Sequence, residues 1–342
     1  MLRNKSIKDI ISDNLPNNFN NSKSPDEKYG VCLDEYSVLV DDEDYWDCAK
    51  DAGCDPAIVE YCEEPVVYTT VDLLDGDEIE ICQAAYNQIR PGYTIIINGP
   101  RRSGKSKLIK NICQRVRPWF PEVVVFTTTK DSGEYFGFIP ISRVVDGLDE
   151  DLLLDLIASQ KRKKKAQTRG EDVGNFNMLI ILDDCMSQKL RYKDIFNLVF
   201  FQGRHYNITL LVTIQDVKGV APAATVNADL CYSFPVKDER SRETINSKYC
   251  DFLDKNSFRT MMANPDLNKK YHVLCYDMAH VHNPINRRIT FGCVNPKEEK
   301  KFVMGDKEMW EDDKEQLVAL GFGYLLSIAD WGIIKTVSKK KK

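Results

Sequence analysis

The residues of the chain best suited to catalytic chemistry begin with Gly99–Ser106, which reads G-P-R-R-S-G-K-S. This segment satisfies the pattern G-x-x-x-x-G-K-[ST], in which glycines let backbone N–H groups surround a polyphosphate. The Lys105 ammonium can reach the β- and γ-phosphates, and the Ser106 hydroxyl can ligate Mg²⁺. A chance glycine-rich loop is the weaker alternative, because a strand pattern precedes the segment and a helical pattern follows it. We therefore predict a site for ATP and Mg²⁺ formed by Gly99, Pro100, Arg101, Arg102, Ser103, Gly104, Lys105 and Ser106.

Two acids follow an apolar run further along the chain, in M-L-I-I-L-D-D (residues 178–184). A carboxylate directly after a buried parallel strand lies at the edge of the sheet where ligands bind. We predict that Asp183 holds Mg²⁺ through water and that Asp184 acts on the attacking water of phosphoryl transfer. Two solvated acids that merely end the strand are the structural alternative.

Two more candidate catalytic side chains lie beyond the acids. Gln215 ends the apolar run Ile208–Ile214, and an amide there can both donate and accept hydrogen bonds beside a γ-phosphate. Arg204, in F-Q-G-R-H, follows a helical pattern, and we predict an arginine finger that acts on a neighbouring subunit's nucleotide. The alternatives are a chance polar residue at a strand end and a surface arginine in a salt bridge.

Other charged clusters are less specific. The run Lys161–Lys165 can contact nucleic-acid phosphates, but a solvated helix end and a localisation signal explain it equally well. His280-Val281-His282 has the look of a metal-binding pair, yet the sequence offers no evident third ligand.

The elements that must position these residues alternate along the chain. Short apolar runs rich in β-branched residues predict strands, and patterns with helical spacing lie between them. This order predicts an α/β fold, a mostly parallel sheet with helices on both faces. The predicted strands are Tyr93–Ile97, Glu122–Thr127, Met178–Leu182, Ile208–Ile214, Leu230–Phe234, His272–Met278 and Arg288–Val294, the last two as a closing hairpin. The predicted helices include Glu78–Ile89, Leu148–Gln160, Arg191–Gln202 and Lys237–Tyr249.

Composition and charge limit the class of protein. A chain of 342 residues with 43% hydrophobic and 29% charged residues is typical of a soluble globular protein, and no apolar run is long enough to cross a bilayer. The 11 cysteines form no C-x-x-C pair, which indicates reduced thiols in a cytosol-like compartment.

Charge is unevenly distributed and suggests an organisation into four parts. Residues 1–90 carry 7 Lys/Arg against 21 Asp/Glu, whereas the remainder carries 40 against 31. We predict a flexible polar arm (1–30), an acidic N-terminal extension (31–90), a nucleotide-binding core (91–295), and a C-terminal helical segment with a basic tail (296–342). A basic body fits a polyanionic partner.

In combination, G-P-R-R-S-G-K-S, L-I-I-L-D-D, G-R-H and I-T-L-L-V-T-I-Q resemble the genome-packaging ATPases of nucleo-cytoplasmic large DNA viruses, in the FtsK–HerA superfamily of P-loop ATPases. The resemblance implies a RecA-like core with one strand inserted between the acid strand and the phosphate-loop strand. It also implies a homo-oligomeric ring that uses ATP to drive double-stranded DNA into a capsid, in contact with capsid or portal-vertex proteins. Its expected location is the host cytoplasm, at the viral factory, and the virion. Many relatives carry Asp-Glu where this chain has Asp183-Asp184, so the second carboxylate here is shorter.

Two other classes of function compete with a DNA translocase. A nucleotide kinase would need an Arg-rich lid, and the sequence shows no clear candidate. A nucleotide-binding assembly protein without turnover would explain the loop alone, but intact Lys105, Ser106, Asp183 and Asp184 argue against it.

Overall fold

The computed structural model describes residues 67–73, 78–82, 89–185, 194–294 and 302–319. The predicted polar arm and the basic tail lie outside these residues, as does most of the acidic extension. The described residues divide into two compact units. One unit consists of those within Ala57–Ile112 and Leu182–Glu298, and the other of those within Cys113–Ile181 and Glu299–Lys342. The domain boundaries expected from the sequence stay a prediction.

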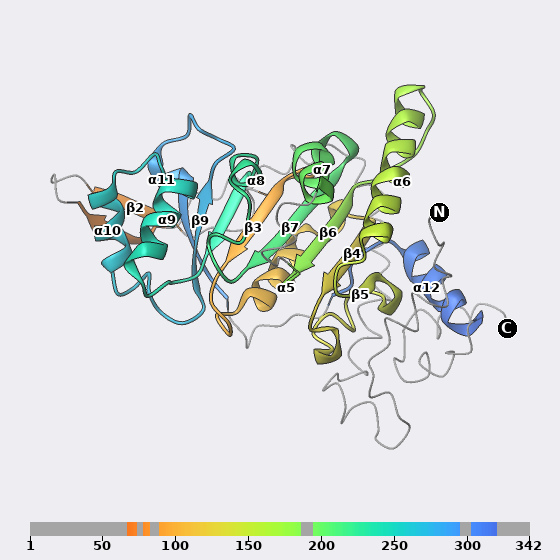
Figure 1. Cartoon of the computed structure of the whole chain (residues 1–342), viewed down its shortest axis with the longest axis horizontal. Coiled ribbons are helices and arrows are strands. Elements are labelled where there is room, and N and C mark those ends of the chain that lie inside the picture. The colour runs from red at the N-terminus through yellow and green to blue at the C-terminus, as the bar shows by residue number, and fades with distance from the viewer. Residues whose placement is uncertain (1–66, 74–77, 83–88, 186–193, 295–301, 320–342) are drawn as a thin grey trace, which may run out of the picture. The chain divides into compact units, whose positions relative to one another are not determined.

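The main sheet is built from eight strands of three to seven residues. They are β3 (Thr94–Asn98), β4 (Glu122–Thr127), β5 (Val144–Asp146), β6 (Met178–Asp183), β7 (Ile208–Ile214), β8 (Leu230–Ser233), β9 (His272–Asp277) and β10 (Ile289–Cys293). Their order in the sheet is β10-β9-β8-β3-β7-β6-β4-β5 (Figure 1).

Strand directions confirm the predicted α/β fold with a mostly parallel sheet. β3 pairs in parallel with β7 on one side and with β8 on the other, and β4 pairs in parallel with β5. β9 runs antiparallel to both β8 and β10, so the predicted closing hairpin is present. One strand, β7, separates the acid strand β6 from β3, as the resemblance implied.

Helices connect most of these strands. They are α5 (Lys105–Val116), α6 (Glu150–Thr168), α7 (Asp194–Gln202), α8 (Pro222–Val226), α9 (Glu239–Tyr249), α10 (Lys255–Ala263), α11 (Ile285–Arg288) and α12 (Lys307–Ala319). Three of them begin with an aspartate whose carboxylate accepts a hydrogen bond from a backbone N–H of the first turn: Asp149, Asp238 and Asp254. The sequence therefore specifies where these helices start.

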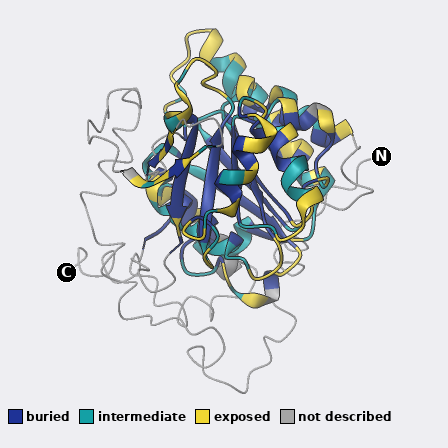
Figure 2. Ribbon diagram, turned by 90° about the vertical axis from the view of Figure 1, so that its left-hand side faces the viewer, coloured by how far each residue is buried: buried dark blue, intermediate teal, exposed yellow. Residues whose placement is uncertain are grey.

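In the unit that contains the phosphate loop, the central strands of the sheet are buried along their whole length. Every residue of β3 and of β7 is buried, which explains why both strands read as continuous apolar runs (Figure 2). Exposed residues gather on the helices and connecting loops instead.

In the other unit, buried polar groups fix two of the connections. The amide of Gln160, on α6, is buried and donates to the carbonyl of Phe176, which anchors the helix to the segment before β6, with an N–O distance of 2.8 Å. Asp313, on α12, accepts a hydrogen bond from the N–H of Ser142 at 3.0 Å.

One predicted element is wrong. Glu78–Ile89 was expected to be helical, but Glu78–Cys82 forms strand β2, which pairs antiparallel with β1 (Val67–Asp72). The run E-I-E-I alternates polar and apolar residues, and its burial alternates with it, as a strand requires. Residues 83–88 lie outside the described residues.

Two further features bear on the compartment and the membrane. In the part of the chain that the structure describes, none of the helices could span a membrane. The cysteines described there are free, and all but the exposed Cys293 are buried: Cys82, Cys113, Cys185, Cys231, Cys250 and Cys275.

Candidate nucleotide-binding site

The phosphate loop joins the end of β3 to the start of α5 and is tied to β7 at its first residue. The Gly99 N–H donates to the carbonyl of Ile214 at 3.1 Å. A Cβ atom on Gly99 would lie 2.7 Å from Ser103 Oγ and 2.9 Å from a ring carbon of Phe234, so no larger residue fits there. Gly104 has φ of +111°, a conformation that favours glycine. Both motif glycines are therefore required by the geometry of the loop.

Lys105 is folded back into the loop. Its side chain is buried, and its Nζ donates to the carbonyls of Gly99 at 3.0 Å and Pro100 at 3.3 Å. Ser106 follows it in the first turn of α5, which contains no acidic residue. The partial positive charge of this helix end is thus available to an anion.

The two acids at the end of β6 are held by one hydroxyl. The Thr213 Oγ1 donates to Asp183 Oδ1 at 2.7 Å and accepts from the N–H of Asp184 at 2.8 Å. Asp183 is only 2% exposed, whereas the Asp184 side chain is 26% exposed. Asp184 has φ of +54°, so the chain leaves the strand at this residue.

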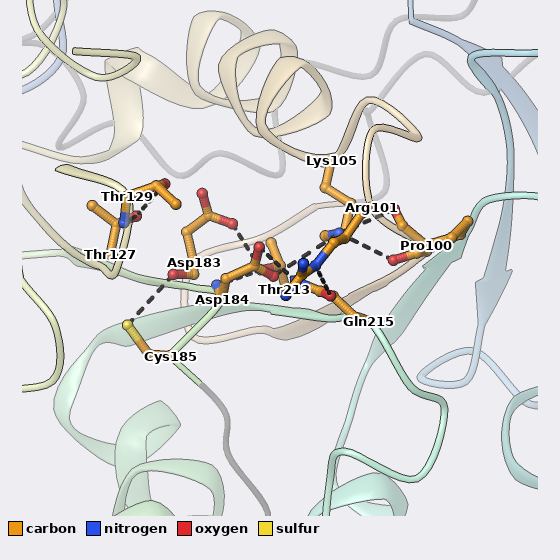
Figure 3. Close-up of polar contacts among 11 residues, drawn as sticks. Pro100, Arg101, Lys105, Thr127, Thr129, Asp183, Asp184, Cys185, Thr213 and Gln215 are labelled. Carbon is orange, nitrogen blue, oxygen red and sulfur yellow. Dashed lines mark hydrogen bonds and ion pairs between the residues drawn. The ribbon is translucent and has the colours of Figure 1, made fainter. Parts of the chain in front are cut away.

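Asp184 is the centre of a chain of polar contacts that reaches back to the loop (Figure 3). Lys105 Nζ lies 3.9 Å from its Oδ1, and the Gln215 Nε2 donates to its Oδ2 at 2.9 Å. The Arg101 Nε donates to Gln215 Oε1 at 3.1 Å. Because a guanidinium only donates and a carboxylate only accepts, these two partners fix the orientation of the Gln215 amide. The structure thus brings together four of the predicted site residues: Arg101, Lys105, Asp184 and Gln215.

Arg204 is not among them, because it lies at the opposite edge of the sheet. It stands in η7 (Gly203–Tyr206), directly before β7 begins, whereas the phosphate loop follows the end of β3. β3 and β7 are parallel, so these positions are at opposite ends of the strands. The Arg204 side chain is exposed. Burial raises the pKa of nearby Asp229, and the positive charge of Arg204 opposes that rise.

The remaining candidates are spread over the loop and the rest of the chain. Pro100, Arg101 and Arg102 are exposed, and Ser103 lies half-buried beneath Gly99. Lys161–Lys165 form the C-terminal half of α6. His280 pairs through Nδ1 with Asp277 Oδ2 at 2.8 Å. Among the described residues, no three His, Cys, Asp or Glu side chains gather as a metal cluster would require.

The residues predicted to hold Mg²⁺ nevertheless have the right chemistry. Ser106 and Asp183 offer a hydroxyl and a buried carboxylate, both oxygen ligands. Mg²⁺ is commonly held by one or two carboxylates together with substrate phosphates and water, so a larger protein cluster is not needed.

Thr213 contacts both acids, although the sequence motifs did not predict it as a site residue. It is completely buried, and its hydroxyl holds both acids. The available signal was a threonine in an otherwise apolar strand, two residues before Gln215. Two threonines occur in this strand, so the pattern alone does not show which one faces the acids.

About half of the amino-acid sequence is similar to proteins of DNA viruses. Residues 84–248 match the protein-family model described as Poxvirus A32 protein. An uncharacterized protein of Acanthamoeba polyphaga mimivirus is 27% identical over 175 residues, which cover 48% of this chain and 60% of the relative. An uncharacterized protein of Invertebrate iridescent virus 3 is 26% identical over 200 residues, covering 54% and 73%. The chain thus spans about three fifths of the length of the mimivirus relative.

Two solved structures resemble this chain over part of its length. The genome packaging NTPase of Sulfolobus turreted icosahedral virus 2, in complex with AMPPCP, is 18% identical with a TM-score of 0.44, and covers 59% of this chain and 98% of that one. The pCW3 conjugation coupling protein TcpA, with ATPγS, is 14% identical with a TM-score of 0.42, covering 75% and 71%.

Proposed function

We propose that the chain, whose residues 84–248 match the family model described as Poxvirus A32 protein, is an ATP-driven translocase that packages double-stranded viral DNA. The observation that carries the proposal is the cluster at the carboxyl edge of β3 and β7. There the Asp184 carboxylate, just after β6, lies 3.9 Å from the Nζ of the phosphate-loop residue Lys105 and accepts a hydrogen bond of 2.9 Å from the Gln215 amide after β7.

Binding of ATP requires Lys105 to exchange partners. Its ammonium now bonds to the carbonyls of Gly99 and Pro100, and we propose that it turns from them to the β- and γ-phosphates. Ser106 and Asp183 would hold Mg²⁺, and the ion would supply positive charge to offset the phosphate charge of the transition state. Thr213 keeps the Asp183 carboxylate in place for this task.

Hydrolysis is assigned to Asp184 and Gln215. Asp184 is the more exposed of the two acids and orients the attacking water, accepting its proton. Gln215 donates to the second oxygen of that carboxylate. Because its amide can both donate and accept hydrogen bonds, we assign it the role of sensing whether a γ-phosphate is present. Arg101 enters this arrangement through Gln215, and Arg102 and Ser103 complete the loop around the phosphates.

Arg204 is assigned to a neighbouring subunit's site. Within its own chain it is at the far edge of the sheet, exposed and remote in strand position from the phosphate loop. An arginine finger supplied from a second subunit stabilises transition-state charge without being part of the first subunit's loop. The proposal therefore requires a homo-oligomeric ring.

The DNA partner is supported by the basic half of α6. Buried residues occupy one side of this helix: Leu153, Leu156, Ile157 and Gln160. Arg162 and Lys165 are exposed, and the spacing of Lys161, Lys165 and Arg169 at every fourth residue places them along one side. Two of the basic side chains are ion-paired, Lys163 with Glu122 and Arg169 with Glu171. Such a basic stripe suits a phosphate backbone.

A direct test is steady-state ATP hydrolysis with and without double-stranded DNA. We expect DNA to raise turnover, and Lys105→Ala and Asp184→Ala each to abolish it. Lys107→Ala, in the same helix but outside the motif, is the matched control and should retain activity. Hydrolysis that ignores DNA would redirect the assignment toward a small phosphoryl acceptor, as in a nucleotide kinase. Binding of ATP without turnover would indicate an assembly switch.

Capsid or portal-vertex proteins are the expected docking partners of such a motor. The expected location follows from this role: the viral factory in the host cytoplasm and the virion.

A further inference from the structure

This inference rests on the proposed function and concerns the nucleoside end of the substrate. Within the unit that holds the loop, β7 lies on one side of β3 and β8 and β9 lie on the other (Figure 1). The catalytic acid Asp184 contacts Thr213 and Gln215, at the end of β7. A triphosphate in the loop must present its γ-phosphate to Asp184. Its nucleoside end then points to the opposite side of β3, toward the end of β8 and the start of β9.

Two aromatic rings stand at that side, directly against the glycines of the loop. Phe234 follows β8, and one of its ring carbons lies 2.9 Å from where a Cβ of Gly99 would be. Tyr271 precedes β9, and its Cδ1 lies 3.0 Å from where a Cβ of Gly104 would be. Because β9 is antiparallel to β8, the start of β9 and the end of β8 share one edge. Both rings therefore adjoin the phosphate loop.

The two rings differ in what they can do. Phe234 is completely enclosed, with 1% of its surface exposed, so it serves as a packing floor beneath the loop. Tyr271 is only partly buried, so part of its ring is open to a ligand. The Lys270 ammonium lies over one face of the Tyr271 ring, 4.7 Å from its centre, so the other face is the one available to a base.

The backbone at Tyr271 is held in an unfavourable conformation. Its φ is +68°, which is rare for a bulky residue and strains the backbone there. The neighbouring hydrogen bonds maintain it: the Val294 N–H donates to the Tyr271 carbonyl at 2.9 Å, and the His272 N–H donates to the Lys269 carbonyl at 3.1 Å. The surrounding structure thus forces the ring against Gly104.

We propose that Tyr271 is the platform on which the base of the bound nucleotide stacks. Phosphates are gripped at the loop and the base lies on the tyrosine ring. Stacking accepts any base, because every base has a π-face. The site therefore takes nucleoside triphosphates in general and discriminates weakly between adenine and guanine.

The test compares a ligand that has a base with one that lacks it. Binding of ATP and of inorganic tripolyphosphate is measured by calorimetry on wild type, Tyr271→Phe, Tyr271→Leu and Tyr271→Ala. We expect Tyr271→Ala and Tyr271→Leu to weaken ATP about 10- to 100-fold and to leave tripolyphosphate unchanged. Tyr271→Phe, which keeps the ring, should bind both ligands as wild type does.

The tripolyphosphate arm also shows whether the loop of each variant is intact. Equal weakening of both ligands in Tyr271→Leu would overturn the proposal, since the ring would then only support the loop. Unchanged ATP binding in that variant would overturn it as well. If the wild-type protein binds neither ligand, the proposed nucleotide site itself fails, which is a separate result from the loss of the base platform.

Discussion

Removal of the Thr213 hydroxyl should lower the free energy of unfolding, because this one group makes hydrogen bonds to both acids of the site. In Thr213→Val the side chain keeps its shape and becomes more apolar at a position that is completely buried. Burial alone would therefore predict a stability equal to or greater than that of wild type. Hydrogen bonding predicts the opposite, so the sign of the change in the free energy of unfolding separates the two effects.

The magnitude follows from the two bonds that the hydroxyl makes. Its bond to the buried Asp183 carboxylate, at 2.7 Å, is of the charge-assisted kind, worth about 1.5–3 kcal/mol. Its loss also leaves the Asp184 N–H without its 2.8 Å acceptor, which costs about 1–3 kcal/mol if no water replaces it. Together these predict a loss of about 2–5 kcal/mol, because the two effects share one atom and do not fully add.

The assay is urea unfolding followed by fluorescence, combined with steady-state ATP hydrolysis. Thr213→Ser keeps the hydroxyl and loses one methyl group, so its stability should fall by only about 1 kcal/mol. Thr209→Val makes the same substitution in the same strand, where the hydroxyl accepts from the neutral Gly92 N–H at 2.7 Å. It should retain turnover, whereas Thr213→Val should lose tenfold or more. A Thr213→Val protein as stable and active as Thr213→Ser would refute the role assigned to this hydroxyl.

Three further predictions follow from the proposed function and the buried acids. Arg204→Ala and Lys105→Ala should each be inactive alone, because an arginine finger raises the rate of hydrolysis about 10³-fold or more. In an equal mixture of the two variants, about a quarter of the subunit interfaces combine an intact lysine with an intact arginine. Activity should return at these interfaces. No recovery on mixing would mean that Arg204 does not act across subunits. Arg162→Ala should reduce the slope of log binding constant against log salt for double-stranded DNA by about 0.9, whereas the ion-paired Lys163→Ala should change it less; equal slopes for both would count against α6. Burial raises the pKa of Asp313 in the folded protein above its ordinary value near 3.8. Its contribution to the free energy of unfolding is therefore fully present below pH 3.8 and is lost as pH rises through the folded pKa. Asp313→Asn should remove this dependence of the free energy of unfolding on pH, and an unchanged pH profile would show that another group is responsible.

The sequence predicted the sheet well because its strands are buried on both faces. A strand such as β7, with all seven residues buried, can only read as an unbroken apolar run. The ends of these runs then located Asp183 and Gln215 at one edge. The error at Glu78–Cys82 has the opposite origin. The first residues of Glu78–Ile89 alternate between polar and apolar, as in a strand. The apolar residues that follow them are spaced as in a helix, so the whole segment was predicted to be helical.

The side chains that the sequence did not assign depend on contacts between distant segments. Thr213 is important because the end of β6 lies beside the end of β7, and Tyr271 because an antiparallel strand returns to the loop edge. Arg101 was predicted to contact phosphate, but in this structure it bonds to Gln215. None of these relations has a local spacing that a motif could record.

Strand β7 lies between two of the predicted catalytic residues, Arg204 and Gln215. Gln215 directly follows this strand, and Arg204 precedes it by residues 205–207, so about 20 Å of buried strand lies between the two positions. A buried strand in a packed sheet does not bend to absorb a shift at one end. In the proposed ring, a nucleotide that draws Arg101 away from Gln215 would act at one end of β7. Arg204, near the other end of this strand, would face the next subunit. Coupling of this kind would allow the subunits to hydrolyse ATP one after another rather than independently.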